Sequence, residues 1–143
     1  MRAGMTVAQI RAAQPAARVP RVRGTLHNMV NERVAICELE IRGSELAGQV
    51  FDTCFYLYAG RLVQVMMTAR RASRALAGTL AAHLRSRHGA ELAEGRDPCP
   101  PAELLTVCEW DWRVAGGAEV NITYADVEGE GAVLNINYRP SFP

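Results

Sequence analysis

The chain has 143 residues, of which 49% are hydrophobic and 22% are charged, and its formal net charge is +1. This length predicts a single globular domain over residues 1–143 that buries a core without metal. The net charge is too small for the basic excess that is typical of a nucleic-acid-binding protein. No run of the sequence approaches the ~18 apolar residues of a transmembrane segment. All sixteen basic residues are arginine, which excludes catalytic lysines and the lysine of a phosphate-binding P-loop.

The first predicted element is a short helix after Thr6. Thr6 and Gln9 have the spacing of a capping box, and Met5 and Ile10 have that of a hydrophobic staple. Pro15 ends the helix, because the residue before a proline is disfavoured in the helical region.

Alternation of apolar and polar residues then predicts strands over 34–41 and 51–58. The turn Ala59-Gly60 leads into a further strand over 62–68, so we expect a hairpin there with glycine supplying the positive φ.

One long helix is predicted over 69–88, with Gly89 as its C-terminal cap. Its predicted apolar face consists of Ala69, Ser73, Leu76, Leu80, His83 and Leu84. We expect His83 to be a hydrogen-bonded core residue rather than a ligand or base.

After a loop over 90–103, alternation predicts strands over 108–113, 120–124 and 133–138. The fold class is therefore α+β: a mainly antiparallel sheet of about six to seven strands, with the short helix and the helix over 69–88 on one face.

The four cysteines form no CxxC pair, which argues against a zinc ribbon or a thioredoxin-type site. Cys99 and Cys108 lie in the loop and the strand that follows it, so a disulfide between them is geometrically allowed. Cys37 and Cys54 are expected on opposite faces, because alternation places only the first among inward-facing positions. The alternative is four reduced thiols that act as small hydrophobic side chains.

Charge is distributed unevenly along the chain. Residues 1–90 contain thirteen arginines and five acids, whereas residues 91–143 contain three arginines and ten acids. Either the acidic strands lie beside the basic helix and neutralise it, or the surface is dipolar and orients a protein partner or a head-to-tail oligomer.

Arg70, Arg71 and Arg74 fall in the first turns of the predicted long helix, where the helix dipole disfavours cations. One interpretation is that acids such as Glu109 and Asp111 offset these charges. The other is a site that binds an anion or an acidic partner.

Tyr56 and Tyr58 are predicted on the face opposite Phe55 and Leu57, because side chains alternate along a strand. They either cover a second layer of the core or are exposed as binding anchors. For the tryptophans on the later strands, core packing is the favoured interpretation.

No catalytic constellation is visible: the histidines are scattered, and carboxylate pairs such as Glu109 and Asp111 are interpreted as solvated. We therefore predict no enzyme activity, no cofactor and no metal site. An alternative is a small anionic-ligand carrier with a pocket between the long helix and the sheet, in which Arg74 binds the anion and the lining is Met66, Leu76, Leu80, Trp110 and Trp112.

The segment Gly4-Met5-Thr6 with Ile10 and Pro15, followed by antiparallel strands, resembles the start of small bacterial envelope domains. These are the SmpA/OmlA lipoproteins of the outer-membrane assembly machinery and the β-lactamase-inhibitor-like domains. This chain lacks their lipobox cysteine and has more strands than one such unit. The resemblance implies a binding or inhibitory module of the cell envelope.

The favoured function is a non-catalytic protein-binding or inhibitor/immunity-type module of a bacterium that uses a sheet face and charged edges. The expected partner is a protein, and a homodimer is an alternative. Arginine-only basic residues and abundant alanine indicate a GC-rich bacterial genome. The N-terminus lacks a signal-peptide pattern, so the sequence as written predicts a cytoplasmic protein, or a periplasmic one if a leader was removed.

Overall fold

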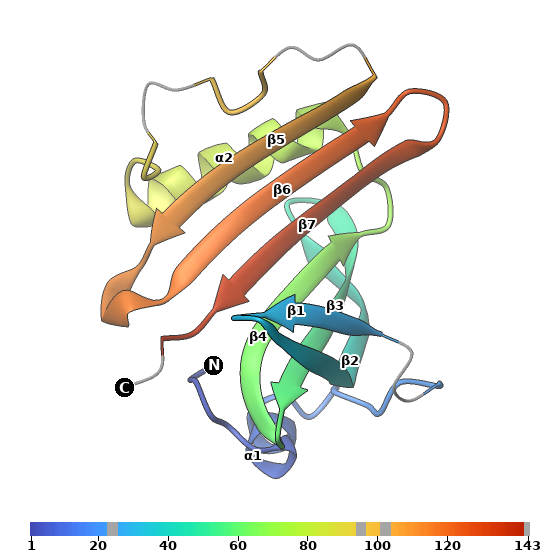
Figure 1. Ribbon diagram of the computed structural model, residues 1–143, viewed down its shortest axis with the longest axis vertical. Helices are drawn as coiled ribbons and strands as arrows, with labels where there is room; N and C mark the ends of the chain where they lie inside the picture. Colours follow the sequence, from blue (N-terminus) through green and yellow to red (C-terminus); the bar gives the residue numbers. More distant parts are fainter. Residues whose placement is uncertain (23–25, 94–96, 101–103, 142–143) are drawn as a thin grey trace.

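The computed structural model describes every residue except 23–25, 94–96, 101–103 and 142–143. Within the described residues, seven strands and two α-helices form an α+β fold, which confirms the predicted class (Figure 1). The strands make one antiparallel sheet in the order β1-β2-β3-β4-β7-β6-β5. The elements are α1 (Val7–Ala13), β1 (His27–Val30), β2 (Arg33–Leu46), β3 (Gln49–Tyr58), β4 (Arg61–Ala69), α2 (Arg74–His88), β5 (Leu105–Arg113), β6 (Glu119–Val127) and β7 (Gly131–Arg139).

The predicted capping box of α1 is confirmed. The Gln9 side-chain oxygen accepts a hydrogen bond from the Thr6 backbone N–H at 2.9 Å, and Thr6 Oγ1 accepts one from the Gln9 N–H at 3.4 Å. Ile10 is fully buried, Met5 packs against the same cluster, and the helix ends before Pro15. These contacts fix α1 against one end of the sheet (Figure 1).

Two-residue turns connect each of the strands β1, β2 and β3 to the next strand, up to β4. In each turn both residues have positive φ, at Asn31-Glu32, Ala47-Gly48 and Ala59-Gly60, which is the geometry of type I′ hairpins. The first of these turns joins β2 to β1, a strand absent from the sequence-based prediction. Its four residues are too few for an alternating pattern to stand out.

The long helix begins at Arg74, not at 69 as predicted. The β3–β4 ladder continues as far as the pair Phe51 and Ala69, so backbone pairing extends the strand into the segment assigned to the helix. Ser73 then caps α2 by accepting a hydrogen bond from the Leu76 N–H at 3.0 Å. Neither helix in the described part of the chain has the length and apolar character needed to span a membrane.

Helix α2 buries Leu76 and Leu80, as predicted, but His83 is exposed, so its expected place in the core is wrong. The partners of α2 are Phe51 and the inward-facing side chains of β5, β6 and β7, including Trp110 and Trp112. Because Phe51 and Phe55 alternate onto the same face of β3, α1 and α2 cover one face of the sheet.

The opposite face is covered over part of its area. The β1–β2 hairpin folds across β3 and β4 there, and Figure 1 shows β1 crossing in front of β4. Beneath it Val30, Cys37 and Tyr56 are buried. The sheet face that the favoured function requires is therefore uncovered over the β5–β7 part of the sheet.

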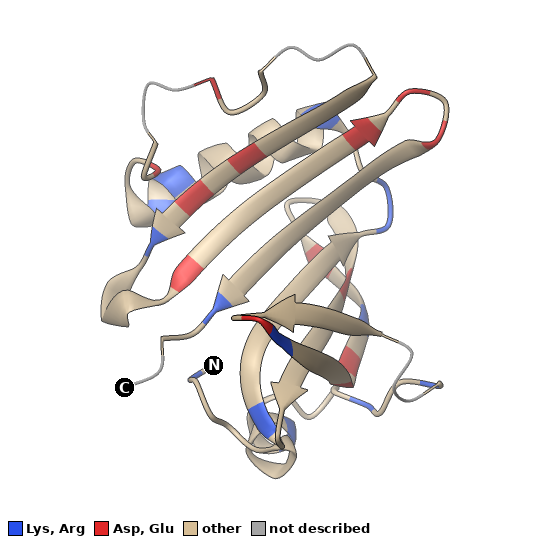
Figure 2. Cartoon of the chain, in the orientation of Figure 1, with Lys and Arg blue, Asp and Glu red and all other residues tan. Residues whose placement is uncertain are grey.

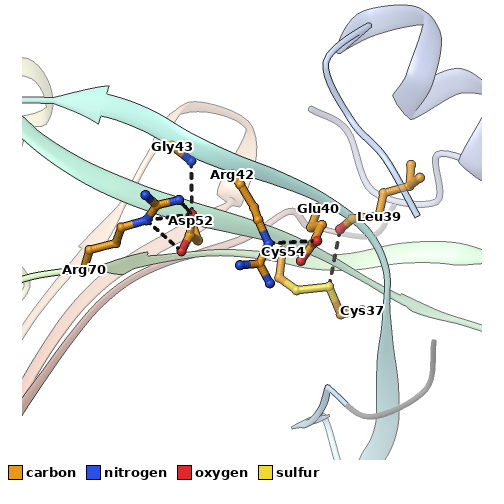
Figure 3. Close-up of polar contacts among 8 residues, drawn as sticks. All are labelled: Cys37, Leu39, Glu40, Arg42, Gly43, Asp52, Cys54 and Arg70. Atoms are coloured by element: carbon orange, nitrogen blue, oxygen red, sulfur yellow. Dashed lines mark hydrogen bonds and ion pairs between the residues drawn. A yellow bond between two sulfur atoms is a disulfide. The ribbon is translucent and has the colours of Figure 1, made fainter. Parts of the chain in front are cut away.

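The structure joins Cys37 to Cys54 and Cys99 to Cys108 by disulfides. The expectation that Cys37 and Cys54 lie on opposite faces is wrong, because a β-bulge at Glu38 shifts the register. Past the bulge, Cys37 pairs with Tyr56 and therefore faces the same side as Cys54 (Figure 3). All four cysteines are oxidised, so the interpretation as reduced thiols is also wrong.

Candidate functional site

The face of β5, β6 and β7 that points away from α2 is the main uncovered part of the sheet. We call it the open face. It consists of Leu105, Val107, Glu109, Asp111 and Arg113 on β5, Glu119, Asn121, Thr123, Ala125 and Val127 on β6, and Val133, Asn135, Asn137 and Arg139 on β7. These residues alternate with the buried side chains beneath α2, so the same three strands supply both a core and a surface.

One end of the open face is apolar and exposed. Val107, Ala125 and Val133 lie side by side across the three strands, and Leu105 pairs with Val127 in the next row. The exposed fractions are 52% for Val133, 45% for Leu105 and 36% for Val107 and Val127. Single exposed valines are common on protein surfaces, whereas a contiguous group is typical of an interaction site.

A chain of side-chain hydrogen bonds crosses the middle of the sheet. Asn121 donates to Asp111 Oδ1 at 2.7 Å, and Asn137 donates to Asn121 Oδ1 at 3.3 Å. Gln64 donates to Asn137 Oδ1 at 2.8 Å, and Asn28 of the covering hairpin donates to Gln64 Oε1 at 3.0 Å. The polar groups of the open face are therefore held in place and linked to the hairpin.

The polar part of the open face is hollowed and acidic. Glu109, Asp111 and Glu119 line a hollow of about 500 Å³, together with Asn121 and Arg139. Figure 2 shows the acidic positions along β5 and β6. The carboxylates outnumber the arginines in this lining, so the hollow attracts cationic groups.

The backbone edge of β5 is occupied by the preceding segment. The Leu92 N–H donates to the Asp111 carbonyl at 2.8 Å, and the Glu109 N–H donates to the Pro98 carbonyl at 3.0 Å. The Cys99–Cys108 disulfide fastens the same segment to the strand. An incoming strand cannot pair with β5 at these positions, so the side chains of the open face are what this region offers a partner.

The structure corrects the interpretation of the arginines. Arg70 and Arg71 precede α2 rather than lying in its first turns. Arg70 makes a two-pronged ion pair with Asp52, at 2.8 Å from Nη2 and 3.1 Å from Nε, and the Gly43 N–H donates to the same carboxylate (Figure 3). These hydrogen bonds, that of Arg70 first, lower the pKa of Asp52. An anion site at Arg71 and Arg74 stays a prediction.

Glu109 and Asp111 do not offset these arginines. Both belong to the open face, whereas α2 packs on the opposite side of β5 against Trp110 and Trp112. The idea that the acidic strands neutralise the basic helix is therefore wrong for these two carboxylates. Other acids do offset arginines of this region: Arg85 of α2 pairs with Glu91 at 2.8 Å, and Arg70 pairs with Asp52 at 2.8 Å.

The two tyrosines have different environments. Tyr56 is 6% exposed, because the β1–β2 hairpin covers it, and burial raises its pKa. Of its two alternatives, the second core layer is therefore confirmed and the surface anchor is wrong. Tyr58 is 39% exposed, and the Arg33 guanidinium lies 5.0 Å from the centre of its ring. Of the pair, Tyr58 is the surface aromatic.

The pocket expected between α2 and the sheet is not assembled. Leu76, Leu80, Trp110 and Trp112 pack directly against one another in the core, and Trp112 Nε1 donates to the Gly89 carbonyl at 3.0 Å. Met66 packs on the opposite face of the sheet, in the cluster beneath the β1–β2 hairpin.

Sequence reasoning missed the apolar group of the open face and the amides beside it. Alternation predicts a strand over 133–138, but it does not say which side of that strand lacks a cover. The available signal was the exchange of polar for apolar residues at one end of that side, with Val133, Val107 and Leu105 all at the same end of their strands.

The described side chains include no group of three or more His, Cys, Asp or Glu residues arranged to hold a metal ion. Comparison with known protein families, curated proteins and solved structures found no match to this chain.

Proposed function

We propose that this protein is a non-catalytic protein-binding module of a bacterium, of the inhibitor or immunity type, and that the open face is its docking surface. The observation that carries the proposal is the contiguous exposed apolar group beside an ordered acidic and amide surface, on a sheet backed by α2. Protein interfaces combine these features, an apolar centre with polar groups around it.

The sheet makes the docking surface rigid before a partner arrives. Each open-face strand is hydrogen-bonded to its neighbours, and Asn121 and Asn137 are held by side-chain hydrogen bonds. Association loses less free energy when the interface is already ordered, because fewer side chains are immobilised on binding.

Charge specifies the kind of partner. The carboxylates of Glu109, Asp111 and Glu119 surround the hollow next to the apolar group. A complementary protein presents an apolar anchor for Val107 and Val133 with arginine or lysine side chains beside it. Opposite charges of this kind increase the rate of association and set the orientation more than they add affinity.

The two disulfides support a place of action outside the reducing cytosol. Disulfides persist in the periplasm and in secreted proteins but are rare in cytosolic ones. This agrees with the resemblance to envelope domains, so the partner is to be sought among periplasmic or secreted proteins.

The test compares matched variants of the immobilised protein. Val133 on the open face is 52% exposed, and Val34 on the outer side of the β1–β2 hairpin is 53% exposed and lies outside the open face. Val133→Asp and Val34→Asp are therefore equivalent changes at different places. From a bacterial periplasmic extract, we expect wild-type protein and Val34→Asp to retain the same basic protein and Val133→Asp to lose it. Glu109→Arg is also expected to lose it, and more so at low salt.

Two outcomes overturn the proposal: no protein retained at all, or retention that Val133→Asp and Val34→Asp change equally. Sedimentation of the purified protein tests the alternative that the chain forms a homodimer. If wild-type and Val34→Asp chains sediment as dimers and Val133→Asp as a monomer, the open face binds a second copy rather than a foreign protein.

A further inference from the structure

A second hollow lies at the end of the sheet where the β1–β2 and β3–β4 turns meet. Its volume is about 490 Å³, which is within the range of small-molecule sites. Its lining consists of Val30, Asn31, Arg33, Tyr58, Ala59, Arg61 and Val63. It shares no residue with the lining of the acidic hollow on the open face.

Two arginines and one tyrosine line this hollow together, and Arg61 also borders a neighbouring hollow beside α1. Arg61 pairs directly with Tyr58 across β3 and β4, and the Arg33 guanidinium lies over the Tyr58 ring at 5.0 Å. Arg61 Nη1 also donates to the Gly4 carbonyl at 3.2 Å. Each guanidinium is thus positioned by a contact that leaves most of its N–H donors unused.

The two positive charges are not compensated locally. Among the described residues no carboxylate lies within 4.0 Å of Arg33 or Arg61, whereas Arg70 and Arg113 each have one. Two positive side chains that line one hollow repel each other, and an anion bound there relieves the repulsion. Guanidinium groups bind carboxylates and phosphates through paired hydrogen bonds.

The rest of the hollow is apolar. Val30 is 5% exposed, Val63 packs in the same cluster, and the Tyr58 ring is available on its exposed side. A ligand that fits therefore has a negatively charged group for the arginines and an apolar body for the valines and the ring.

We propose that Arg33, Tyr58 and Arg61 form a binding site for a small organic anion, a carboxylate or phosphate ester on an apolar body. This site is separate from the open face, so it stands if the docking surface fails. It also differs from the ligand pocket expected between α2 and the sheet, which the core fills.

The test titrates named anions into the ¹⁵N- and ¹³C-labelled protein and follows the Tyr58 ring and the arginine Nε–Hε signals by NMR. Benzoate and phenyl phosphate represent the two anion types on an apolar body; acetate and inorganic phosphate are the same anions without it. We expect saturable shifts at Tyr58, Arg33 and Arg61 with at least one aromatic anion, and weaker binding of its small counterpart.

Arg33→Gln with Arg61→Gln is expected to weaken that binding by about tenfold or more for each arginine removed. Arg87→Gln is the control, because Arg87 is exposed near the end of α2 and lines neither hollow. Thermal unfolding shows whether each variant is folded.

The proposal is overturned if neither aromatic anion gives saturable shifts, or if the double variant binds as well as Arg87→Gln does. Binding of benzoate alone identifies a carboxylate ligand, and binding of phenyl phosphate alone identifies a phosphate ester. Equal binding of inorganic phosphate or acetate contradicts the role assigned to the apolar lining.

Discussion

Gln64 and Asn137 are buried polar side chains between the covering hairpin and the open face, with 1% and 8% exposure. Gln64 bonds to Asn28 of the covering hairpin on one side and to Asn137 on the other. No buried side-chain nitrogen or oxygen in the described residues lacks a hydrogen-bond partner. The pair therefore fixes how the hairpin lies on the sheet without the cost of an unsatisfied polar group.

Replacement of Gln64 by Leu tests this role. It leaves the Asn137 and Asn28 amides without their buried partner, so we expect a loss of about 1–3 kcal/mol in the free energy of unfolding, measured by urea denaturation. Adding Asn137→Leu should cost less than the sum of the two single changes, because the unpaired amide of Asn137 is removed too. Strictly additive losses would contradict the coupling.

Asp52 gives the fold a dependence on pH. Hydrogen bonds from Arg70 and Gly43 lower its pKa in the folded state, so its contribution to stability is present above the unfolded pKa of about 4 and is lost as pH falls through the folded value.

We expect Asp52→Asn to lower the unfolding free energy at pH 7 by at most about 1 kcal/mol, because the ion pair is partly exposed. The difference from wild type should disappear in acid denaturation series below the folded pKa. A difference that is the same at pH 7 and pH 2 would mean that the charge of Asp52 is irrelevant.

At the scale of elements, the hairpins and disulfides decide the register. The β-bulge at Glu38 places Cys37 and Cys54 on one face, and the resulting disulfide spans 17 residues beneath the β1–β2 hairpin. The second disulfide spans 9 residues and fastens the segment before β5 to its edge.

Removal of the Cys37–Cys54 bond by paired Cys→Ala changes is expected to lower the unfolding free energy by about 3 kcal/mol, from the entropy of the unfolded loop. Denaturant unfolding of oxidised wild type and variant measures it. Equal stability of the two, with four free thiols titrated in unfolded wild type, would show that the bond is not formed.

A substitution in the β3–β4 turn is expected to raise the stability of the fold rather than lower it. Ala59 has φ of 48°, a conformation that asparagine tolerates better than alanine in a type I′ turn. Ala59→Asn should raise the midpoint of thermal unfolding, with a gain of about 0.5–1 kcal/mol. No change or a fall would contradict the turn assignment, and Ala82→Asn on exposed α2 is the control in which asparagine lowers stability.

Sequence patterns predicted those elements whose geometry depends on residues close together in the sequence. The capping box of Thr6 and Gln9 and the turn at Ala59-Gly60 were read correctly, because both are complete within a few residues. The start of α2 was misplaced, because pairing with Phe51 holds Ala69 in a strand. The Cys37–Cys54 bond was missed for the same reason: a bulge is set by the partner strand.

At the scale of the molecule, the two hollows differ in the charge that predominates in their lining. The hollow of the open face is lined by Glu109, Asp111 and Glu119, whereas Arg33 and Arg61 line the other hollow. The sequence leaves open whether its uneven charge is neutralised in the fold or separated in space. Composition does not say where the acidic and basic residues lie in the fold, because their places depend on which strand faces the β1–β2 hairpin and α2 cover.

The most direct test of the docking surface is site-specific photo-crosslinking. A benzophenone side chain placed at Val133, and in a second variant at Val34, is irradiated with bacterial periplasmic extract and the products are compared by mass spectrometry. The docking account predicts one major covalent adduct with a basic protein at position 133 and none at 34. Absence of an adduct at 133, or the same adduct from both positions, would contradict it.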